Sequence, residues 1–331
     1  MKLLTEKDAS LEPLKGKTVA IIGYGNQGRA QGLNLRDSGI KVIVGNRDDE
    51  YRKQAIKDGF EPMTIAEAAE AGDILHILTT DESQPVICDD QIAPGIQPGN
   101  TLMWGSGYNV GFNLIKPPTE TDAIMIAPRM TGNMVRELFQ HGKGAIAQCA
   151  IHQDATGHAN ETMLALCKGI GLTRGGVFMS TFREEAELDL FAEQVYWPVL
   201  AAWVQECFKM GVEFGFSPEL MVMELYASSE TSEIMGLMAK NGFFKQMSFH
   251  STTSQYGTLS RCRDILNDEI KSKSRERFLK GIRGGEFIKE WSHEQATGLK
   301  RLADLLKEAH GGAMSQAEKN LIPQIQSAHS L

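Results

Sequence analysis

The sequence predicts a doubly wound α/β domain over residues 1–180, followed by an all-helical domain over residues 181–331. Three observations predict this division. Short apolar strands alternate with helical patterns in the first half, a glycine-rich turn follows the first of these strands, and strand signals stop near Thr181. Because alternating strands and helices, with strands buried on both faces, are typical of a parallel sheet covered by helices, we expect a parallel sheet in the first domain.

Strands are expected where β-branched or other apolar residues run together, at 17–22, 40–44, 74–78, 101–104 and 123–127. Helices are expected between them, at 27–38, 50–58 and 64–71, the first of them closed by Gly39. The second domain is expected to consist of successive helices, at 184–211, at 218–240 and in several pieces from 259 to 310. Asn241-Gly242 and Gly284-Gly285 mark turns between these helices, and the polar tail after Gly311 is expected to be loose.

Composition excludes several classes of protein. The chain has 331 residues and carries 34 Lys and Arg against 42 Asp and Glu, a formal net charge of −8, so we expect neither a nucleic-acid nor a membrane partner. No apolar run approaches the roughly 20 residues that span a bilayer. The N-terminal stretch is polar and lacks the apolar segment of a signal peptide, and a cytoplasmic protein is expected. Five dispersed cysteines, each expected to be reduced and buried, fit that compartment: Cys88, Cys149, Cys167, Cys207 and Cys262.

The run Gly23-Tyr24-Gly25-Asn26-Gln27-Gly28 matches the pattern GxGxxG after a predicted strand and at the start of a predicted helix. This context predicts a Rossmann dinucleotide site. Gly23 permits the tight turn, Gly25 lets the backbone approach a pyrophosphate, and Gly28 lets the helix pack close to the strand. We take the six residues as cofactor-binding candidates; the alternative is a strand–helix turn with glycines there by chance.

The end of the second strand is where a dinucleotide site distinguishes NADPH from NADH. Arg47, with Arg52 as a second candidate, could pair with a 2′-phosphate. Asp48, Asp49 and Glu50 would repel that phosphate, and one of them, with Asp49 as the candidate, could accept a ribose hydroxyl. This loop therefore favours NADH, against the alternative of a solvated charge run that opens a helix.

Asp189 and Glu193 lie four residues apart on a predicted helix, so both carboxylates face one side. Two oxygen donors suit a hard cation such as Mg²⁺, and Glu224 on the next helix could approach the same ion. The alternative is a solvated acidic helix face.

Taken together, these segments resemble the ketol-acid reductoisomerase family, the acetohydroxyacid isomeroreductases of branched-chain amino-acid synthesis, in its short form. The resemblance runs from about Leu14 to Ile325, and its most specific segments are Asp189-Leu190-Phe191-Ala192-Glu193-Gln194 and His152-Gln153-Asp154. Further matching segments follow in the same order: the glycine run and 33–39, 81–84, 151–157, 168–171, 184–185 and 253–257.

The resemblance implies a Rossmann domain, a knotted helical C-terminal domain, and a homodimer or larger assembly whose active site is shared between subunits. It also implies that two Mg²⁺ ions drive an alkyl migration and that NAD(P)H, NADPH by family, then reduces the ketone. Asp189 resembles the ligand that bridges the ions, Glu193 is a second ligand, and Glu224 takes the position of a third, supplied by the other subunit.

Four positions depart from the family pattern. Ser106 stands where the family has a histidine, and Arg129 where it has a lysine, so we take both as altered catalytic positions. Ser228 replaces the fourth carboxylate, one helical turn after Glu224, and Gln255 replaces an acid. Ser251 keeps a serine that the resemblance associates with the substrate carboxylate.

Because these departures fall on chemistry, we expect an NAD(P)H-dependent reductase of a small 2-oxo acid, or of a related carbonyl or imine. Hydride transfer should survive, and the isomerisation step is in question. Two alternatives stay open. The first is a genuine ketol-acid reductoisomerase acting on 2-acetolactate, with one or two Mg²⁺ ions and with Glu230 or water replacing the missing ligand. The second is an NAD(P)-binding protein without catalysis.

Overall fold

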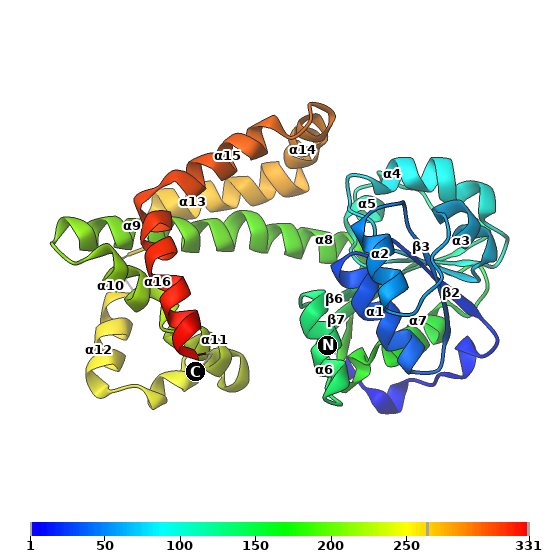
Figure 1. The fold of residues 1–331 in the computed structure, drawn as a ribbon, viewed down its shortest axis with the longest axis horizontal. Helices are drawn as coiled ribbons and strands as arrows, with labels where there is room; N and C mark the ends of the chain where they lie inside the picture. The colour runs from blue at the N-terminus through cyan, green and yellow to red at the C-terminus, as the bar shows by residue number, and fades with distance from the viewer. Residues whose placement is uncertain (1, 263–264, 330–331) are drawn as a thin grey trace. The chain divides into compact units, whose positions relative to one another are not determined.

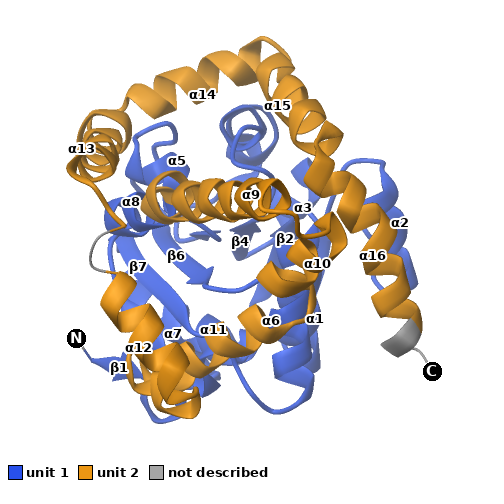
Figure 2. Cartoon of the chain, turned by 90° about the vertical axis from the view of Figure 1, so that its left-hand side faces the viewer, with its two compact units in different colours: residues 1–189 blue, residues 190–331 orange. Residues whose placement is uncertain are grey.

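The computed structural model describes residues 2–262 and 265–329 and divides the chain into two compact units, 1–189 and 190–331 (Figure 2). The division falls within helix α8 (Phe182–Phe191). Each unit is considered by itself.

Unit 1 contains one eight-stranded sheet in the order β1-β8-β7-β6-β5-β4-β2-β3 (Figure 1). Its strands are β1 (Leu3–Leu4), β2 (Thr18–Ile22), β3 (Lys41–Gly45), β4 (Ile74–Ile77), β5 (Thr101–Trp104), β6 (Asp122–Pro128), β7 (Ala147–Gln153) and β8 (Val177–Met179). The five predicted strands are all present, within two residues at each end. These five strands pair in parallel, as predicted. The sheet as a whole is mixed, because β6 pairs with β7, and β1 with β8, in antiparallel register, and each of these pairs includes a strand that was not predicted.

Both faces of this sheet are buried. Val19 and Ile21 of β2 point into one apolar cluster, and Ala20 and Ile22 point into a second cluster on the opposite face. The helices that complete the two layers are α1 (Asn26–Asp37), α2 (Glu50–Lys57), α3 (Ile65–Ala71), α4 (Gln84–Ile87), α5 (Tyr108–Gly111), α6 (Gly132–Gln140) and α7 (Ala159–Ile170). The doubly wound α/β architecture predicted from the sequence is therefore confirmed.

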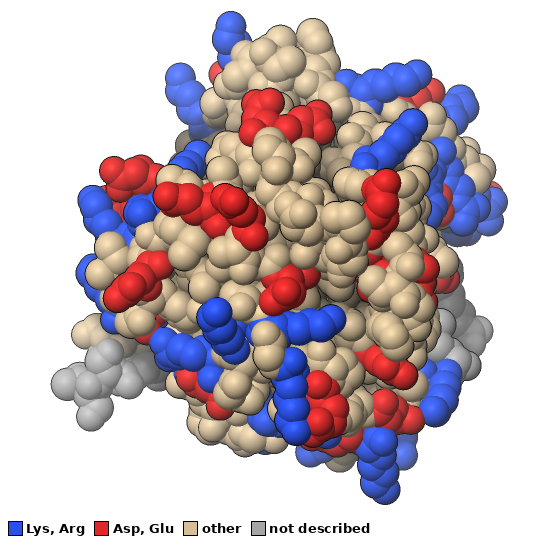
Figure 3. All heavy atoms as spheres, turned by 90° about the vertical axis from the view of Figure 1, so that its right-hand side faces the viewer, with Lys and Arg blue, Asp and Glu red and all other residues tan. Residues whose placement is uncertain are grey.

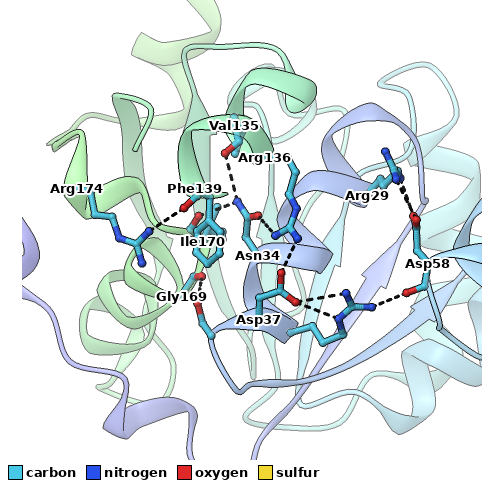
Figure 4. A network of polar contacts seen from close by, with 12 residues as sticks. Arg29, Asn34, Asp37, Asp58, Val135, Arg136, Phe139, Gly169, Ile170 and Arg174 are labelled. Carbon is cyan, nitrogen blue, oxygen red and sulfur yellow. Dashed lines mark hydrogen bonds and ion pairs between the residues drawn. The ribbon is translucent and has the colours of Figure 1, made fainter. Parts of the chain in front are cut away.

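A buried polar network joins α1 to α6 and α7 (Figure 4). Asn34, fully buried on α1, donates from Nδ2 to the carbonyl of Ile170, at 3.0 Å, and accepts at Oδ1 from Nη1 of Arg136, at 2.8 Å. Arg136 also pairs with Asp37, at 2.5 Å. Because each of these groups would cost free energy if it were buried without a partner, the network fixes α6 in one position on α1.

The register of the parallel strands sets where the loops lie. Ile22 of β2 pairs with Ile77 of β4, which pairs with Trp104 of β5, which in turn pairs with Met125 of β6. The carboxyl ends of these strands thus meet at one edge of the sheet. β2 lies between β3 and β4, the point at which the strand order reverses and at which ligands bind in such folds.

Unit 2 is helical throughout its described residues, as predicted. It begins within the helical run of α8, which continues through a π-helical turn (Ala192–Tyr196) into α9 (Trp197–Glu213). The later elements are α10 (Pro218–Val222), a π-helical turn (Met223–Ala227), α11 (Glu230–Asn241), α12 (Thr252–Arg261), α13 (Asp268–Glu276), a π-helical turn (Arg277–Arg283), α14 (Glu286–Ala296), α15 (Lys300–Gly311) and α16 (Ala313–His329). The knot implied by the resemblance stays a prediction.

Two expectations about unit 2 are wrong. The helix expected over 218–240 is interrupted at Ser229, whose φ of 71° lies in the left-handed region. The tail expected to be loose after Gly311 forms α16, because it packs on α10 and buries Ala317. The hydroxyl of Tyr226 donates to Glu318 of α16, at 2.5 Å.

The cysteines are all free thiols, but only Cys149 and Cys167 are buried. Cys88 and Cys207 are partly exposed and Cys262 is exposed, so the expectation that every cysteine is buried is wrong. Within residues 2–262 and 265–329, no helix is both long enough and apolar enough to cross a membrane. On the face of the molecule shown in Figure 3, acidic and basic side chains are interspersed.

The buried network around Asn34 predicts a large cost for an isosteric apolar change. Asn34→Leu removes the side-chain amide and leaves the Ile170 carbonyl and one N–H group of Arg136 without a hydrogen-bonding partner. We expect the free energy of unfolding to fall by about 2–4 kcal/mol. Urea unfolding measures it, with Asn160→Leu at an exposed position of α7 as the control, expected to change stability by less than about 0.5 kcal/mol. Equal losses in the two variants would contradict the role given to the network.

Candidate functional site

Four loops meet at the carboxyl edge of the parallel strands. They begin at Gly23 after β2, at Leu78 after β4, at Gly105 after β5 and at Arg129 after β6. Helix α8 packs against the β5 loop, where a Cβ on Gly107 would lie 2.0 Å from the carbonyl oxygen of Phe182. This close approach brings the first turns of α8 to the same edge.

The glycines of the GxGxxG run differ in what they provide. Gly23 has a φ of 94°, and a Cβ there would lie 2.9 Å from the backbone nitrogen of Thr79. A Cβ on Gly28 would lie 1.9 Å from the carbonyl oxygen of Gly23, so only glycine lets α1 begin this close to the turn. Space is open around the Cβ position of Gly25, at the N-cap of α1, as the approach of a pyrophosphate requires.

The other three residues of the run turn their side chains toward the protein. Tyr24 is buried, with 1% of its surface exposed, and its hydroxyl donates to Asp58, at 3.0 Å. Asn26 Oδ1 accepts from the backbone nitrogen of Asn133, at 3.0 Å, and Gln27 Nε2 donates to the carbonyl of Met130, at 2.8 Å. Each of these three side chains therefore already has a hydrogen-bonding partner within the protein.

The loop after β3 is held together by its own side chains. Asp49 caps α2 by accepting from the backbone nitrogens of Tyr51 and Arg52, and its carboxylate also pairs with Arg47, at 2.7 Å. Burial raises the pKa of Asp49, but the hydrogen bonds outweigh it and leave the pKa below its usual value.

The two arginines of this loop differ in what holds them. Arg52 donates to the carbonyls of Asn46, Pro62 and Met63, so its predicted role as a phosphate partner is not supported by its geometry. Arg47, the other candidate, keeps an exposed side chain.

A cluster of charges lies at the ends of β4, β5 and β6. The guanidinium of Arg129 bridges two carboxylates on successive turns of α8, Glu185 at 2.8 Å and Asp189. The backbone nitrogen of Gly107 donates to the other oxygen of Glu185, at 2.6 Å. Since Glu185 is 1% exposed, Arg129 and Gly107 provide the polar partners that its burial demands.

Two carboxyl groups of this cluster have raised pKa values. Burial raises the pKa of Glu185 to about 7, against the lowering effects of the Gly107 N–H group and Arg129, with Asp189 and Asp81 raising it further. Desolvation raises the pKa of Asp81 to about 6, and the hydroxyl of Ser106, which donates to Asp81 at 3.3 Å, opposes it. Both groups therefore exchange protons close to neutral pH.

Ser106, Arg129 and Asp189 were predicted from the sequence, whereas Asp81 and Glu185 were not predicted as members of the cluster. A signal for Glu185 was present, because Glu185 and Asp189 share the four-residue spacing used to select Asp189 and Glu193. What the sequence did not show is that this turn of α8 is the buried one.

The remaining candidates lie in unit 2. Glu193 and Glu224 both fall in π-helical turns, where the four-residue spacing of an α-helix no longer holds. Ser251 is the N-cap of α12, and its hydroxyl accepts from the backbone nitrogen of Ser254, at 3.2 Å. Among the residues that the structure describes, no three His, Cys, Asp or Glu side chains are grouped so as to hold a metal ion.

Two family models match the chain. One, described as "Acetohydroxy acid isomeroreductase, NADPH-binding domain", matches residues 13–176, and the other, "Ketol-acid reductoisomerase, C-terminal domain", matches residues 182–326. Similar curated proteins include "Putative ketol-acid reductoisomerase 3" of Saccharolobus solfataricus, 44% identical and covering 96% of both chains. "Ketol-acid reductoisomerase (NADP(+))" of Pyrobaculum neutrophilum is 44% identical and covers 93% of this chain and 94% of its own.

A solved structure is similar over the whole fold. It is described as "Structure of NADH-preferring ketol-acid reductoisomerase from an uncultured archean" and is 33% identical, with a TM-score of 0.92 over 97% of this chain and 98% of its own.

The raised pKa of Glu185 predicts a pH-dependent loss of stability. Its pKa is about 7 in the folded state and near 4.5 in the unfolded chain, so the folded state binds more protons between these values. The stability that this group contributes is full below pH 4.5 and is lost as the pH rises to 7, by at most about 1.4 kcal/mol per pH unit. Glu185→Gln should abolish this component.

Chemical unfolding of wild type and Glu185→Gln between pH 4.5 and 7 measures the difference. Glu184→Gln, at the exposed neighbouring position on α8, is the matched control and should run parallel to wild type. If the free energy of unfolding of Glu185→Gln also changes with pH in parallel with that of wild type, the raised pKa of Glu185 is contradicted.

Proposed function

The chain belongs to the ketol-acid reductoisomerase family of NAD(P)H-dependent oxidoreductases, and we propose that it reduces a small 2-oxo acid, or a related carbonyl or imine, with little or no alkyl migration. The observation that carries this proposal is the bridge from Arg129 to Glu185 and Asp189 at the carboxyl edge of the sheet. It places a fixed cation and a protonatable carboxyl group in one cluster. The same loop contacts the dinucleotide turn through Met130 and Gln27.

The dinucleotide is proposed to lie against the N-terminus of α1, where Gly25 leaves room for its pyrophosphate. Arg47 then faces the adenosine end. A bound NAD(P)H supplies the hydride for the carbonyl carbon of the substrate.

The residues of the cluster have separate tasks. Arg129 has five N–H donors, of which the two carboxylates use only part, so it also binds the substrate carboxylate and keeps the 2-oxo group in place. Asp81, partly exposed and with its pKa raised to about 6, gives its proton through the Ser106 hydroxyl to the developing alkoxide oxygen and regains one from water. Glu185, whose two oxygens accept from Arg129 and from the backbone of the β5 loop, holds Arg129 in place. Ser106, hydrogen-bonded to Asp81, orients the substrate oxygen from the β5 loop. Ser251 is proposed to bind the substrate carboxylate from the N-terminus of α12.

We propose one Mg²⁺ rather than two, and this proposal rests on the family resemblance, since no three His, Cys, Asp or Glu side chains are grouped for a metal ion within residues 2–262 and 265–329. Asp189 gives one carboxylate oxygen to Arg129, and its other oxygen, together with Glu193 and the Glu224 supplied by a second copy of the chain, would provide the oxygen donors that Mg²⁺ prefers. An ion there would polarise the substrate carbonyl. Ser228 directly follows the π-helical turn of Glu224 and offers only a neutral hydroxyl where a second ion needs a carboxylate. Because alkyl migration needs a ketone and a hydroxyl polarised together, the loss of the second ion affects that step most.

The genuine ketol-acid reductoisomerase remains a second candidate. It is favoured by relatives 44% identical over 93% or more of this chain that bear that name. Under this reading water or another residue completes the second metal site. Glu230 is the replacement suggested by the sequence. It is the first residue of α11, beyond the break at Ser229, so it does not lie on a continuation of the helix that carries Glu224.

We also propose a homodimer or larger homo-oligomer. Unit 2 exposes large apolar side chains that its own helices do not cover, among them Phe214 at 77%, Phe249 at 65% and Trp203 at 46%. Within the described residues, α12 to α15 bury none of their side chains. Such surface is of the kind that a second copy of the chain buries.

Two substrates separate the two candidate functions. 2-Acetolactate must isomerise before reduction, whereas 3-hydroxy-3-methyl-2-oxobutyrate needs reduction alone. With Mg²⁺ and either dinucleotide at saturation, we expect oxidation of the cofactor with the second substrate and at least about 100-fold lower kcat/KM with the first, a barrier difference of about 2.7 kcal/mol. Comparable turnover of both substrates would support the genuine ketol-acid reductoisomerase. The absence of turnover with any 2-oxo acid would contradict the proposed reductase.

The loop after β3 predicts a preference for NADH. Asp49 and Glu50 are already paired, with Arg47 and Lys53, whereas Asp48 stays exposed beside Arg47 and repels a 2′-phosphate. Asp48→Ser should raise kcat/KM for NADPH relative to NADH by about two- to fivefold, the effect of one exposed like charge. Glu50→Gln, which removes an acid already paired with a lysine, is the control. If the ratio of kcat/KM for NADPH to that for NADH is unchanged in Asp48→Ser but shifted in Glu50→Gln, Asp48 is not the residue that discriminates between the two dinucleotides.

A further inference from the structure

The segment from Arg129 to Asn133 rests directly on the dinucleotide turn. Gln27 Nε2 donates to the Met130 carbonyl, at 2.8 Å, and the Asn133 backbone nitrogen donates to Asn26 Oδ1, at 3.0 Å. A Cβ on Gly132 would lie 2.1 Å from the carbonyl oxygen of Asn26, so the two backbones are in van der Waals contact. Two side chains and one close backbone approach thus join the segment to the first turn of α1.

Both ends of this segment are also anchored. At its start the backbone nitrogen of Arg129 donates to the carbonyl of Ile146, at 2.9 Å, which continues the pairing of β6 with β7. At its end α6 is held on α1 by the Asn34 and Arg136 network (Figure 4). The middle of the segment, at Met130, has Gln27 as its hydrogen-bonding support from α1.

Gln27 is in turn held by α1 itself. Its Oε1 accepts from Nε2 of Gln31, one turn further along the helix, at 3.0 Å. Gln31 is fully buried, whereas Gln27 is partly exposed, and the pair links the body of α1 to Met130. The position of Met130 determines where the neighbouring Arg129 backbone lies, and hence where its guanidinium meets Glu185 and Asp189.

We propose that Gln27, assisted by Asn26, is a positioning residue that couples dinucleotide binding to the placement of Arg129, so that cofactor and substrate carboxylate bind cooperatively. The proposal rests on the proposed function only in taking Arg129 as the group that binds the substrate carboxylate. A dinucleotide on the backbone of the first turn of α1 fixes Asn26 and Gln27, and their side chains hold the segment with Arg129 in its binding position. By linkage, a carboxylate on Arg129 strengthens dinucleotide binding by the same factor.

The test measures this coupling directly. The dissociation constant of oxalate, a dicarboxylate that accepts no hydride under these conditions, is measured by calorimetry with and without saturating NADH, for wild type and for Gln27→Met. Methionine keeps the length of the side chain and removes both its donor to Met130 and its acceptor for Gln31. We expect NADH to tighten oxalate binding about three- to tenfold in wild type, the range of one hydrogen bond, and less than about twofold in Gln27→Met. The affinity of the variant for NADH alone should stay close to that of wild type.

Two further variants separate positioning from general damage. Gln54→Met makes the same change on α2, where the side chain donates to Asp58, and should keep the wild-type coupling. In an Arg129→Met background, Gln27→Met should have no further effect on oxalate binding or on the KM of the 2-oxo acid, because it acts through Arg129. If Arg129→Met does not fold, the coupling measured on Gln27→Met alone decides the question.

The outcomes distinguish this proposal from the proposed function. NADH-dependent oxalate binding that is lost in Gln27→Met supports the coupling even if no 2-oxo acid is turned over. If wild type turns over a 2-oxo acid but NADH does not change its dissociation constant for oxalate, the proposed coupling is wrong and the proposed reductase activity is correct. An NADH affinity reduced as much as the oxalate affinity in Gln27→Met also overturns it, because Gln27 then serves the cofactor itself.

Discussion

The site depends on the parallel register of β2, β4, β5 and β6. Because these strands pair in step, the chain leaves each of them at the same edge of the sheet, and the loops that follow are forced together. Gly23, Ser106 and Arg129 are far apart in sequence and become neighbours in the fold for this reason alone. A shift of one residue in any of these strands would also turn its apolar side chains to the wrong cluster, so the packing of both faces protects the geometry of the edge.

Burial of Glu185 is the second constraint, and it follows from the first. Helix α8 approaches the β5 loop closely because Gly107 has no side chain, and the approach carries Glu185 out of water. A carboxylate enclosed in this way must be paired or protonated. Arg129 and the Gly107 N–H group pair with the ionised form and lower the pKa, whereas burial raises it to about 7, so the carboxyl group changes between its ionised and protonated forms near neutral pH.

Elements with a strong local sequence pattern could be predicted from the sequence, whereas elements that form through tertiary contacts could not. The strands of apolar, often β-branched residues and the glycine turn were predictable, because each is fixed by its own side chains. β7 was missed because its small and polar residues become a strand by pairing with β6 and β8. α16 was missed because a polar tail becomes a helix by packing on α10. Glu185 was missed because burial, which sets its chemistry, comes from a glycine 78 residues earlier in the chain.

The departures from the family pattern are not equivalent in physical terms. Ser106 and Arg129 sit on loops at the edge of the parallel strands, where other groups, Asp81 and Glu185, can hold the proton and where a guanidinium still supplies positive charge. Ser228 has no such support from its own stretch of helix, because it ends a π-helical turn beside the break at Ser229 and the chain begins a new helix at Glu230. Under the proposed function, hydride transfer draws on what the edge of the sheet retains, a cation and a carboxyl group whose pKa is near neutral. Under the same proposal, alkyl migration requires the second ion that the family resemblance implies, at the position where Ser228 stands in place of a carboxylate. The reduction step is therefore the one that this set of substitutions leaves best supported.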